Sequence, residues 1–429
     1  MNQYRKNKGY RALFNATMLT AIGNSLFNIV FIVYASQQPF NKLAITLASM
    51  TMFIPAFLDP WVGHLADQTI RKHKWMVYSR ILQGLLFVLL ASIVMLPSSM
   101  MLFLILLVIN VASDCLGEYG NGLCLAYFQA MIPTEEVDGV MGFQMSARTM
   151  VQLIFQGIAG WAIVQMNYQY SLFGLINACF FFAAAFVVFV HQKDFYLNKG
   201  VAEDAQANDA EIEKLSFKES LRFTGKLINK NFALKLLLIV ALFFNLLGSS
   251  FGSLLNISLL TLSNMWIQNF AQTISLVSVF ISVGVLVGSF TINGLFKNWE
   301  PHRIIMLALV VMMCFPINIL FIQSRVLLFA NVLLSGYLMG KINPRISAMM
   351  IKIIPQDKLA ISSGIFQLIV LIGGPIGQVI FLGSANLFSS TISWAIYLIM
   401  TVMILIAMKR TETLNERKML KAINSSPQS

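Results

Sequence analysis

Twelve apolar runs alternate with polar segments along the 429-residue chain. A helix of about 20 apolar residues is long enough to cross the hydrocarbon core of a bilayer. We therefore predict an all-α integral membrane protein with twelve transmembrane helices. The predicted helices cover residues 12–35, 43–65, 76–96, 101–127, 140–165, 169–191, 232–258, 267–296, 303–322, 326–350, 359–385 and 390–408.

A long polar segment, residues 192–231, separates six of these runs from the other six. It is charged and poor in aromatic residues, which predicts a linker between two parts of the protein. The predicted organisation is an N-terminal half (1–191), the linker, a C-terminal half (232–408) and a tail (409–429).

The two halves also resemble each other in sequence. AMIPTEEVDGVMGFQ at 130–144 and IIPQDKLAISSGIFQ at 353–367 occupy corresponding places, and Pro133 and Pro355 are 222 positions apart (355 − 133). Two parallel repeats joined by a linker are an architecture of membrane transporters. We therefore predict two pseudo-symmetric six-helix halves.

Composition supports a lipid environment. The chain is 57% hydrophobic and 11% charged, whereas a soluble domain is about a quarter charged. Its net charge of +12 is spread over short loops and both tails, so no basic stripe suited to nucleic acid is present. The four cysteines lie within apolar runs without metal-type spacing, and we expect them to be packing residues.

Lysine and arginine are distributed unequally between the two sides of the predicted membrane. One side carries the N-terminal tail, the bases at 71–74, the linker and the C-terminal tail, whereas the other carries only Lys42 and Arg325. Loops rich in lysine and arginine face the cytoplasm. Both termini are therefore predicted to be cytoplasmic, which requires an even number of spans.

The segment GHLADQTIRKHKW, residues 63–75, lies between the second and third apolar runs. Gly63 permits close helix packing near the membrane surface. Asp67 is an anion in a place where a helix N-terminus can stabilise it. Arg71 and Lys72 either take part in the same site or only set the topology and contact anionic lipid.

This segment resembles the signature of the major facilitator superfamily, in which a glycine and an aspartate between helices 2 and 3 precede two bases. Gly63, Asp67, Arg71 and Lys72 fit that signature, whereas Gln68 and Ile70 depart from it. The resemblance extends over nearly the whole chain and is greatest to the bacterial drug-efflux branch that includes macrolide exporters.

The resemblance implies the major facilitator fold in a bacterial plasma membrane, with helices 1, 4, 7 and 10 around a central cavity. It also implies that Asp67 and its neighbouring bases form a gate that holds the halves together on the cytoplasmic side. Asp59 and Arg80, at comparable depth on helices 2 and 3, are predicted first to form a structural ion pair and second to belong to that gate.

Ionisable residues within membrane spans are costly and are candidates for function. Asp114 and Glu118 are four residues apart and share one face of helix 4. Arg148 of helix 5 lies at a similar predicted depth. Either the two acids carry a coupling proton or meet a cationic substrate, with Arg148 tuning them, or Glu118 and Arg148 form a fixed ion pair.

Helix 10 carries bases where helix 4 carries acids, at Lys341 and Arg345. These bases either bridge to the acidic helix 4 across a closed cytoplasmic mouth or bind an anionic substrate. A third possibility is that Arg345 extends to the membrane surface.

Polar residues of helices 1 and 7 need partners inside the membrane. Asn24 and Asn28 share a face of helix 1, and Asn245 and Ser249 share a face of helix 7. They are candidates for the cavity wall, and contacts between helices are an equal alternative.

Gly374 and Pro375 in helix 11 predict a bend or hinge, because proline removes a backbone donor. The pair resembles the glycine-proline signature of antiporters, but that signature belongs in helix 5. There, Gly157 and Gly160 occur without a proline, which weakens the case for proton antiport.

Taken as a whole, the sequence predicts a secondary transporter that exports small amphipathic or cationic compounds by alternating access, driven by proton entry. Rivals in the same class are an importer of a solute and a transporter of an anionic metabolite, peptide or siderophore. A non-transporting membrane sensor is the rival from another class. We expect a monomer in contact with membrane lipids, with no cofactor, no metal, no nucleic acid and no enzymatic activity, and no ATP-binding loop motif occurs.

Overall fold

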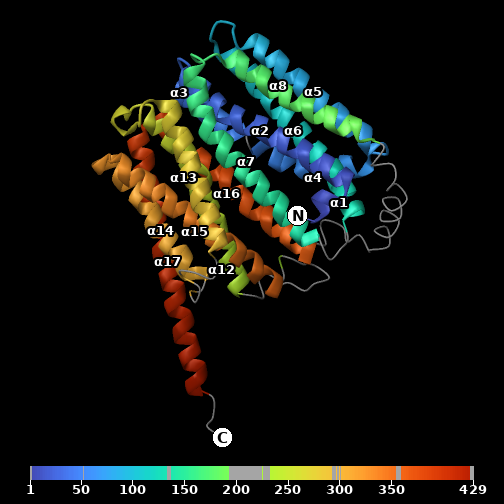
Figure 1. Ribbon diagram of the computed structural model, residues 1–429. Coiled ribbons are helices and arrows are strands. Elements are labelled where there is room, and N and C mark those ends of the chain that lie inside the picture. Colours follow the sequence, from blue (N-terminus) through green and yellow to red (C-terminus); the bar gives the residue numbers. More distant parts are fainter. Residues whose placement is uncertain are drawn as a thin grey trace. The chain divides into compact units, whose positions relative to one another are not determined.

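The computed structural model is made of helices, and it contains no strand in the part of the chain that it describes (Figure 1). The structure describes all residues except 1, 52, 133–136, 193–224, 226–231, 292–295, 297–298, 300, 354–358 and 426–429. Most of the predicted linker therefore lies outside the described residues.

The helices follow the predicted apolar runs in order. The first eight are α1 (Asn2–Lys6), α2 (Lys8–Ser36), α3 (Asn41–Thr51), α4 (Phe53–Gln68), α5 (Lys72–Ile93), α6 (Met100–Met131), α7 (Val137–Gln165) and α8 (Tyr170–Val190). The later α-helices are α12 (Phe232–Leu259), α13 (Phe270–Phe290), α14 (Pro301–Ile317), α15 (Arg325–Ile353), α16 (Leu359–Leu387) and α17 (Ser390–Ser425). Two short helical segments, η3 (Ser263–Met265) and η4 (Asn318–Ile322), complete the described set.

Twelve segments of these helices are long and apolar enough to cross a membrane, which confirms the predicted number. The second span runs from Asn41 to Leu58, across α3 and the start of α4. Several helices continue beyond their apolar part. Helix α6 has 32 residues and α17 has 36, well above the length that a bilayer requires.

Contacts group the helices into two compact units. The first unit comprises Met1–Lys214 together with Ile267–Val279, and the second comprises Leu215–Trp266 and Phe280–Ser429. Helix α13 therefore contributes its first half to one unit and its second half to the other.

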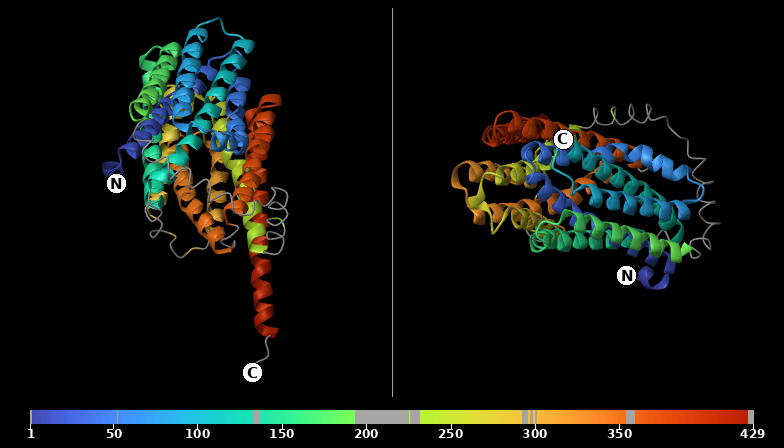
Figure 2. Two further views of the ribbon diagram at one scale, coloured as in Figure 1. Left: turned by 90° about the vertical axis from the view of Figure 1, so that its right-hand side faces the viewer. Right: turned by 90° about the horizontal axis from the view of Figure 1, so that it is seen from above.

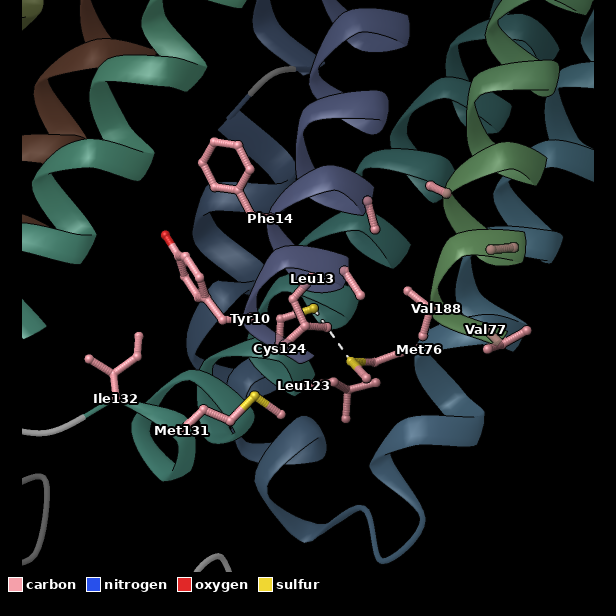
Figure 3. Close-up of a cluster of buried hydrophobic side chains, with 14 of the residues drawn as sticks. Tyr10, Leu13, Phe14, Met76, Val77, Leu123, Cys124, Met131, Ile132 and Val188 are labelled. Carbon is pink, nitrogen blue, oxygen red and sulfur yellow. Dashed lines mark hydrogen bonds between the residues drawn. The ribbon is translucent and has the colours of Figure 1, made fainter. Parts of the chain in front are cut away.

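In the first unit, α5 packs on α8 and α6, and α2 packs on α8 and α7 (Figures 1 and 2). A cluster of buried apolar side chains lies where α2, α5 and α6 meet (Figure 3). Leu13 and Leu123 are fully buried there, and the thiol of Cys124 on α6 faces the sulfur of Met76 on α5 at 3.4 Å. This cluster fixes the register between α5 and α6.

In the second unit, α12 packs on α16, and α14 packs on α15 and α17. Glycines bring the backbones of α13 and α15 together. A Cβ atom on Gly288 would lie 2.1 Å from the carbonyl oxygen of Tyr337, and one on Gly340 would lie 2.2 Å from that of Val285. Small residues permit this close approach of helices within a membrane.

Candidate functional site: charged residues between α5 and α6

Helix α6 carries the two predicted intramembrane acids, and both side chains are half-buried. Asp114 accepts a hydrogen bond from the Asn110 side chain at 3.3 Å. Glu118 accepts one from the side-chain amide of Asn121 at 3.4 Å. Both acids lie within the span Met100–Cys124, one helical turn apart. Holding two like charges so close in a span is costly, as the sequence predicted.

Arg80 of α5 is a buried cation beside this face of α6, and only 5% of it is exposed. Its guanidinium donates to the side-chain oxygen of Gln83 at 2.8 Å and to that of Asn121 at 3.4 Å. Gln83 in turn donates to the backbone carbonyl of Ser113 on α6 at 2.8 Å. A buried guanidinium is thus held on α6 by neutral amides.

Two glycines of α6 make room for these side chains. A Cβ atom on Gly120 would lie 3.3 Å from the guanidinium carbon of Arg80, and one on Gly117 would lie 3.2 Å from the amide nitrogen of Gln83. Their lack of a side chain therefore lets the long polar side chains of α5 lie flat against the α6 backbone.

Asn121 connects the two charged groups because its carbonyl oxygen faces Arg80 and its amide nitrogen faces Glu118. We call Arg80, Asp114, Glu118 and Asn121 the α6 charge cluster. Arg148 of α7 is exposed, and the described hydrogen bond of Glu118 comes from Asn121 instead.

Sequence reasoning missed the amides of this cluster, namely Gln83, Asn110 and Asn121. Their spacing was informative, because Gln83 follows Arg80 by three residues, and Asn121 follows Glu118 by three. Residues three apart lie on the same helix face, so each charged residue had a polar neighbour beside it. The predicted partner of Arg80, Asp59, has a side chain outside the described residues, so the Asp59–Arg80 pair stays a prediction.

The predicted gate motif lies at the end of α4 and the start of α5. Arg71 is exposed, whereas the ammonium group of Lys72 donates to the backbone carbonyl of Ala66 at 2.6 Å. The surroundings of Gly63 and the side chain of Asp67 lie outside the described residues, so the role of Asp67 in a gate stays a prediction.

Lys341 of α15 is completely buried in the second unit. Its ammonium group donates to the backbone carbonyl of Thr291, just beyond the end of α13, and lies 3.2 Å from the Thr291 hydroxyl. It also lies 4.9 Å from the ring centre of Tyr337. A cation at a helix C-terminus is favourable, and an aromatic face adds to that. The side chain of Arg345 lies outside the described residues.

The polar residues predicted for the cavity wall occupy different surroundings. Asn245 donates to the carbonyl of Val370 at 2.7 Å, and Ser249 to that of Gly374 at 3.4 Å, so both side chains bind the α16 backbone. Asn24 is half-buried and Asn28 is exposed on α2.

Pro375 lies inside the continuous helix α16, and Gly374 beside it is buried. The neighbouring Gly373 and Gly377 bring α16 against α12, since Cβ atoms there would lie 2.4 and 2.1 Å from the carbonyls of Leu242 and Leu246. The described residues contain no group of histidine, cysteine and acidic side chains that could hold a metal ion.

Comparisons with known proteins agree with this architecture. The sequence profile described as the Major Facilitator Superfamily matches residues 13–378. A comparison with curated proteins finds no match. Among solved structures, the chain is similar to the peptide transporter POT, with 14% identity over 94% of this chain and 95% of that one and a TM-score of 0.67.

Two further solved structures show the same fold. The nucleoside transporter NupG is 12% identical over 93% of this chain and 99% of that one, with a TM-score of 0.67. A bacterial homolog of the human lysosomal transporter Spinster, solved inward-facing and unoccupied, is 12% identical over 96% and 98%, with a TM-score of 0.62.

Proposed function

Because this chain belongs to the major facilitator superfamily, we propose that it is a secondary active transporter that exports small amphipathic or cationic compounds in exchange for protons. The family establishes a multi-pass membrane transporter. Export, proton coupling, the drug-efflux branch, a bacterial plasma membrane, a monomeric state and cytoplasmic termini belong to the proposal.

The acidic pair Asp114 and Glu118 is the observation that carries the proposal. Two carboxylates lie one helical turn apart within a single span, and the described residues bring one buried cation, Arg80, into hydrogen-bond contact with their network. One acid therefore remains without a cation of its own in the described network. Such a group can take up a proton or accept a cationic substrate and then release it.

The second candidate is transport of an anionic metabolite, peptide or siderophore, or import instead of export. The peptide and nucleoside transporters named above fit import as well as the proposal does. Lys341 was a candidate for binding an anionic cargo, but it is completely buried and already bonded to Thr291. This observation favours the cationic substrate of our first proposal over an anionic one.

The test measures flux of a panel of cationic, neutral and anionic compounds in vesicles with an imposed proton gradient. We expect wild-type protein to move a cationic compound against its gradient, and Asp114→Asn or Glu118→Gln to abolish the dependence of flux on the proton gradient. Asp114→Glu and Glu118→Asp keep the charge and serve as matched controls that retain at least part of the flux.

Each other outcome identifies a rival. Gradient-dependent flux that is unchanged in both neutral variants would show that these acids do not carry coupling. Uptake of an anionic compound would favour the second candidate, and no flux of any compound would favour the sensor.

A further inference from the structure

A hydrogen bond bridges the two ends of the short loop between α4 and α5. The loop consists of residues 69–71, and the side chain of Lys72, the first residue of α5, reaches back to the carbonyl of Ala66 in the last turn of α4. Ala66 is fully buried, and a Cβ atom on Gly122 of α6 would lie 3.0 Å from its side chain. The loop is therefore a compact turn whose base rests on α6.

A hydrogen bond between side chains joins Thr69 of this loop to Tyr119 of α6. The Thr69 hydroxyl donates to the backbone carbonyl of Leu65 at 2.8 Å, and it lies 2.8 Å from the Tyr119 hydroxyl, which is therefore the donor of that pair. The Tyr119 ring also meets the ring of Trp75 on α5 edge to face, with centroids 6.5 Å apart. Tyr119 thus contacts both the loop and the helix that follows it.

Tyr119 is the neighbour of Glu118 in the charge cluster. Arg80 lies two turns into α5, the helix that begins directly after the loop, and it is tied to Glu118 through Asn121. The segment from Thr69 to Arg80 is therefore attached to α6 by polar bonds at Tyr119 and Asn121, and Glu118 directly precedes Tyr119 in the chain.

We propose that the Thr69–Tyr119 hydroxyl pair is a latch that links the position of the α4–α5 loop to the charge of Glu118. When Glu118 is charged, its hydrogen bond through Asn121 holds Arg80 and α5 against α6, and the latch is closed. When Glu118 is neutral, that attraction is lost, α5 is held less tightly, and the latch opens more often. This inference rests on the proposed function for its purpose, since protonation of Glu118 during transport would release the loop.

The test uses a nitroxide spin label at position 70, because Ile70 is 95% exposed and lies in the loop. The label is attached to Ile70→Cys after the four native cysteines have been replaced by alanine, in lipid nanodiscs. Loss of one neutral hydrogen bond shifts an equilibrium by about two- to tenfold. We therefore expect Tyr119→Phe and Thr69→Val each to raise the ratio of mobile to immobile label by that factor.

Two combinations separate a latch from a general loosening. The double variant Thr69→Val/Tyr119→Phe should give the same ratio as Thr69→Val alone, because Thr69→Val already removes the bond to Tyr119 together with the bond from Thr69 to the Leu65 carbonyl. Glu118→Gln should raise the ratio when the latch is intact and leave it unchanged in the Tyr119→Phe background. Tyr78→Phe is the matched control, since the Tyr78 ring makes the same edge-to-face contact with Trp75, and its label ratio should equal that of the wild type.

Additive effects of Thr69→Val and Tyr119→Phe would overturn the latch, as would an unchanged ratio in Tyr119→Phe. An unchanged ratio in Glu118→Gln would overturn the link to the charge cluster. Thermal unfolding of every variant confirms that it is folded. The measurement needs no substrate, so it gives an answer even if the flux experiment refutes the proposed function.

Discussion

Arg80 is a guanidinium group withdrawn from solvent and bonded to neutral amides, one of which also contacts a carboxylate. Removing one partner of a buried charge network leaves the other partners unpaired. We expect Arg80→Met to lower the free energy of unfolding by about 1–3 kcal/mol, because the side-chain oxygens of Gln83 and Asn121 lose their donor. Thermal unfolding in detergent measures the change.

Arg148→Gln is the control for that variant. Arg148 is an arginine of the same unit, but its side chain is exposed. Its removal should change the free energy of unfolding by less than about 0.5 kcal/mol. Equal losses from the two variants would show that the buried position of Arg80 is not what matters.

Lys341 is a second buried cation, and its ammonium group lies at the C-terminal end of a helix. Lys341→Glu would place an anion against the C-terminal carbonyls of α13, and we expect a loss of about 3 kcal/mol or more. Lys341→Met should cost less than about 1 kcal/mol, because it also removes the cost of burying a charge. The same unfolding assay distinguishes them, and a loss in Lys341→Glu no larger than that in Lys341→Met would contradict the capping role.

The residues of the charge cluster show what sequence can and cannot provide. Asp114, Glu118 and Arg80 were recognisable because a charge within an apolar run is unusual. Their actual contacts were not, because pairing depends on which helix faces lie together. Depth alone suggested Asp59 for Arg80, which stays a prediction, and Arg148 for Glu118. It gave no indication that Arg80 and Glu118 both contact Asn121.

At the scale of helices, the close contact between α13 and α15 at Gly288 and Gly340 should not tolerate an added side chain. We expect Gly288→Ala and Gly340→Ala each to destabilise the protein by about 1–3 kcal/mol, because the added methyl group meets a backbone carbonyl that cannot rotate away. Gly252→Ala is the matched control: nothing lies within 4 Å of its Cβ position on α12. It should be neutral or stabilising by about 0.5–1 kcal/mol.

Pro375 offers a second prediction about a helix. Pro375→Ala restores a backbone donor within α16, so the free energy of unfolding should rise by up to about 3 kcal/mol. If this position is a hinge, the same variant should slow transport. An unfolding assay together with vesicle flux would show both effects, and full flux in a stabilised variant would argue against a hinge.

Glycine pairs that permit close helix contacts could be recognised in the sequence, but the partner helix of each pair could not be assigned. Gly284 and Gly288, Gly336 and Gly340, and Gly373 and Gly377 are each four residues apart, a spacing typical of close helix contacts in membranes. The spacing identifies the face of one helix and leaves its partner open. Contacts between particular backbones supply that partner.

For the whole chain, the number and order of the helices followed from the apolar runs, because the need to satisfy every backbone group in lipid leaves few alternatives. Orientation rests on the positions of lysine and arginine and can be tested directly. We expect Leu96→Cys to react with a membrane-impermeant maleimide in intact cells, and Ile70→Cys to react only after permeabilisation. Both positions are exposed, at 56% and 95%, so accessibility within the protein does not limit labelling. The reverse pattern would place the termini outside.

Helix α13 carries a consequence for how the protein is made. Residues 267–279 group with the first unit, where a Cβ atom on Gly160 of α7 would lie 2.4 Å from the carbonyl of Ala271. The ribosome must therefore synthesise the first half of α13 before α7 can meet this neighbour. A fragment that ends at Lys214 would present an unfilled glycine surface to the membrane insertion and quality-control machinery. Such a fragment should be degraded when expressed alone and rescued when the remainder of the chain is co-expressed.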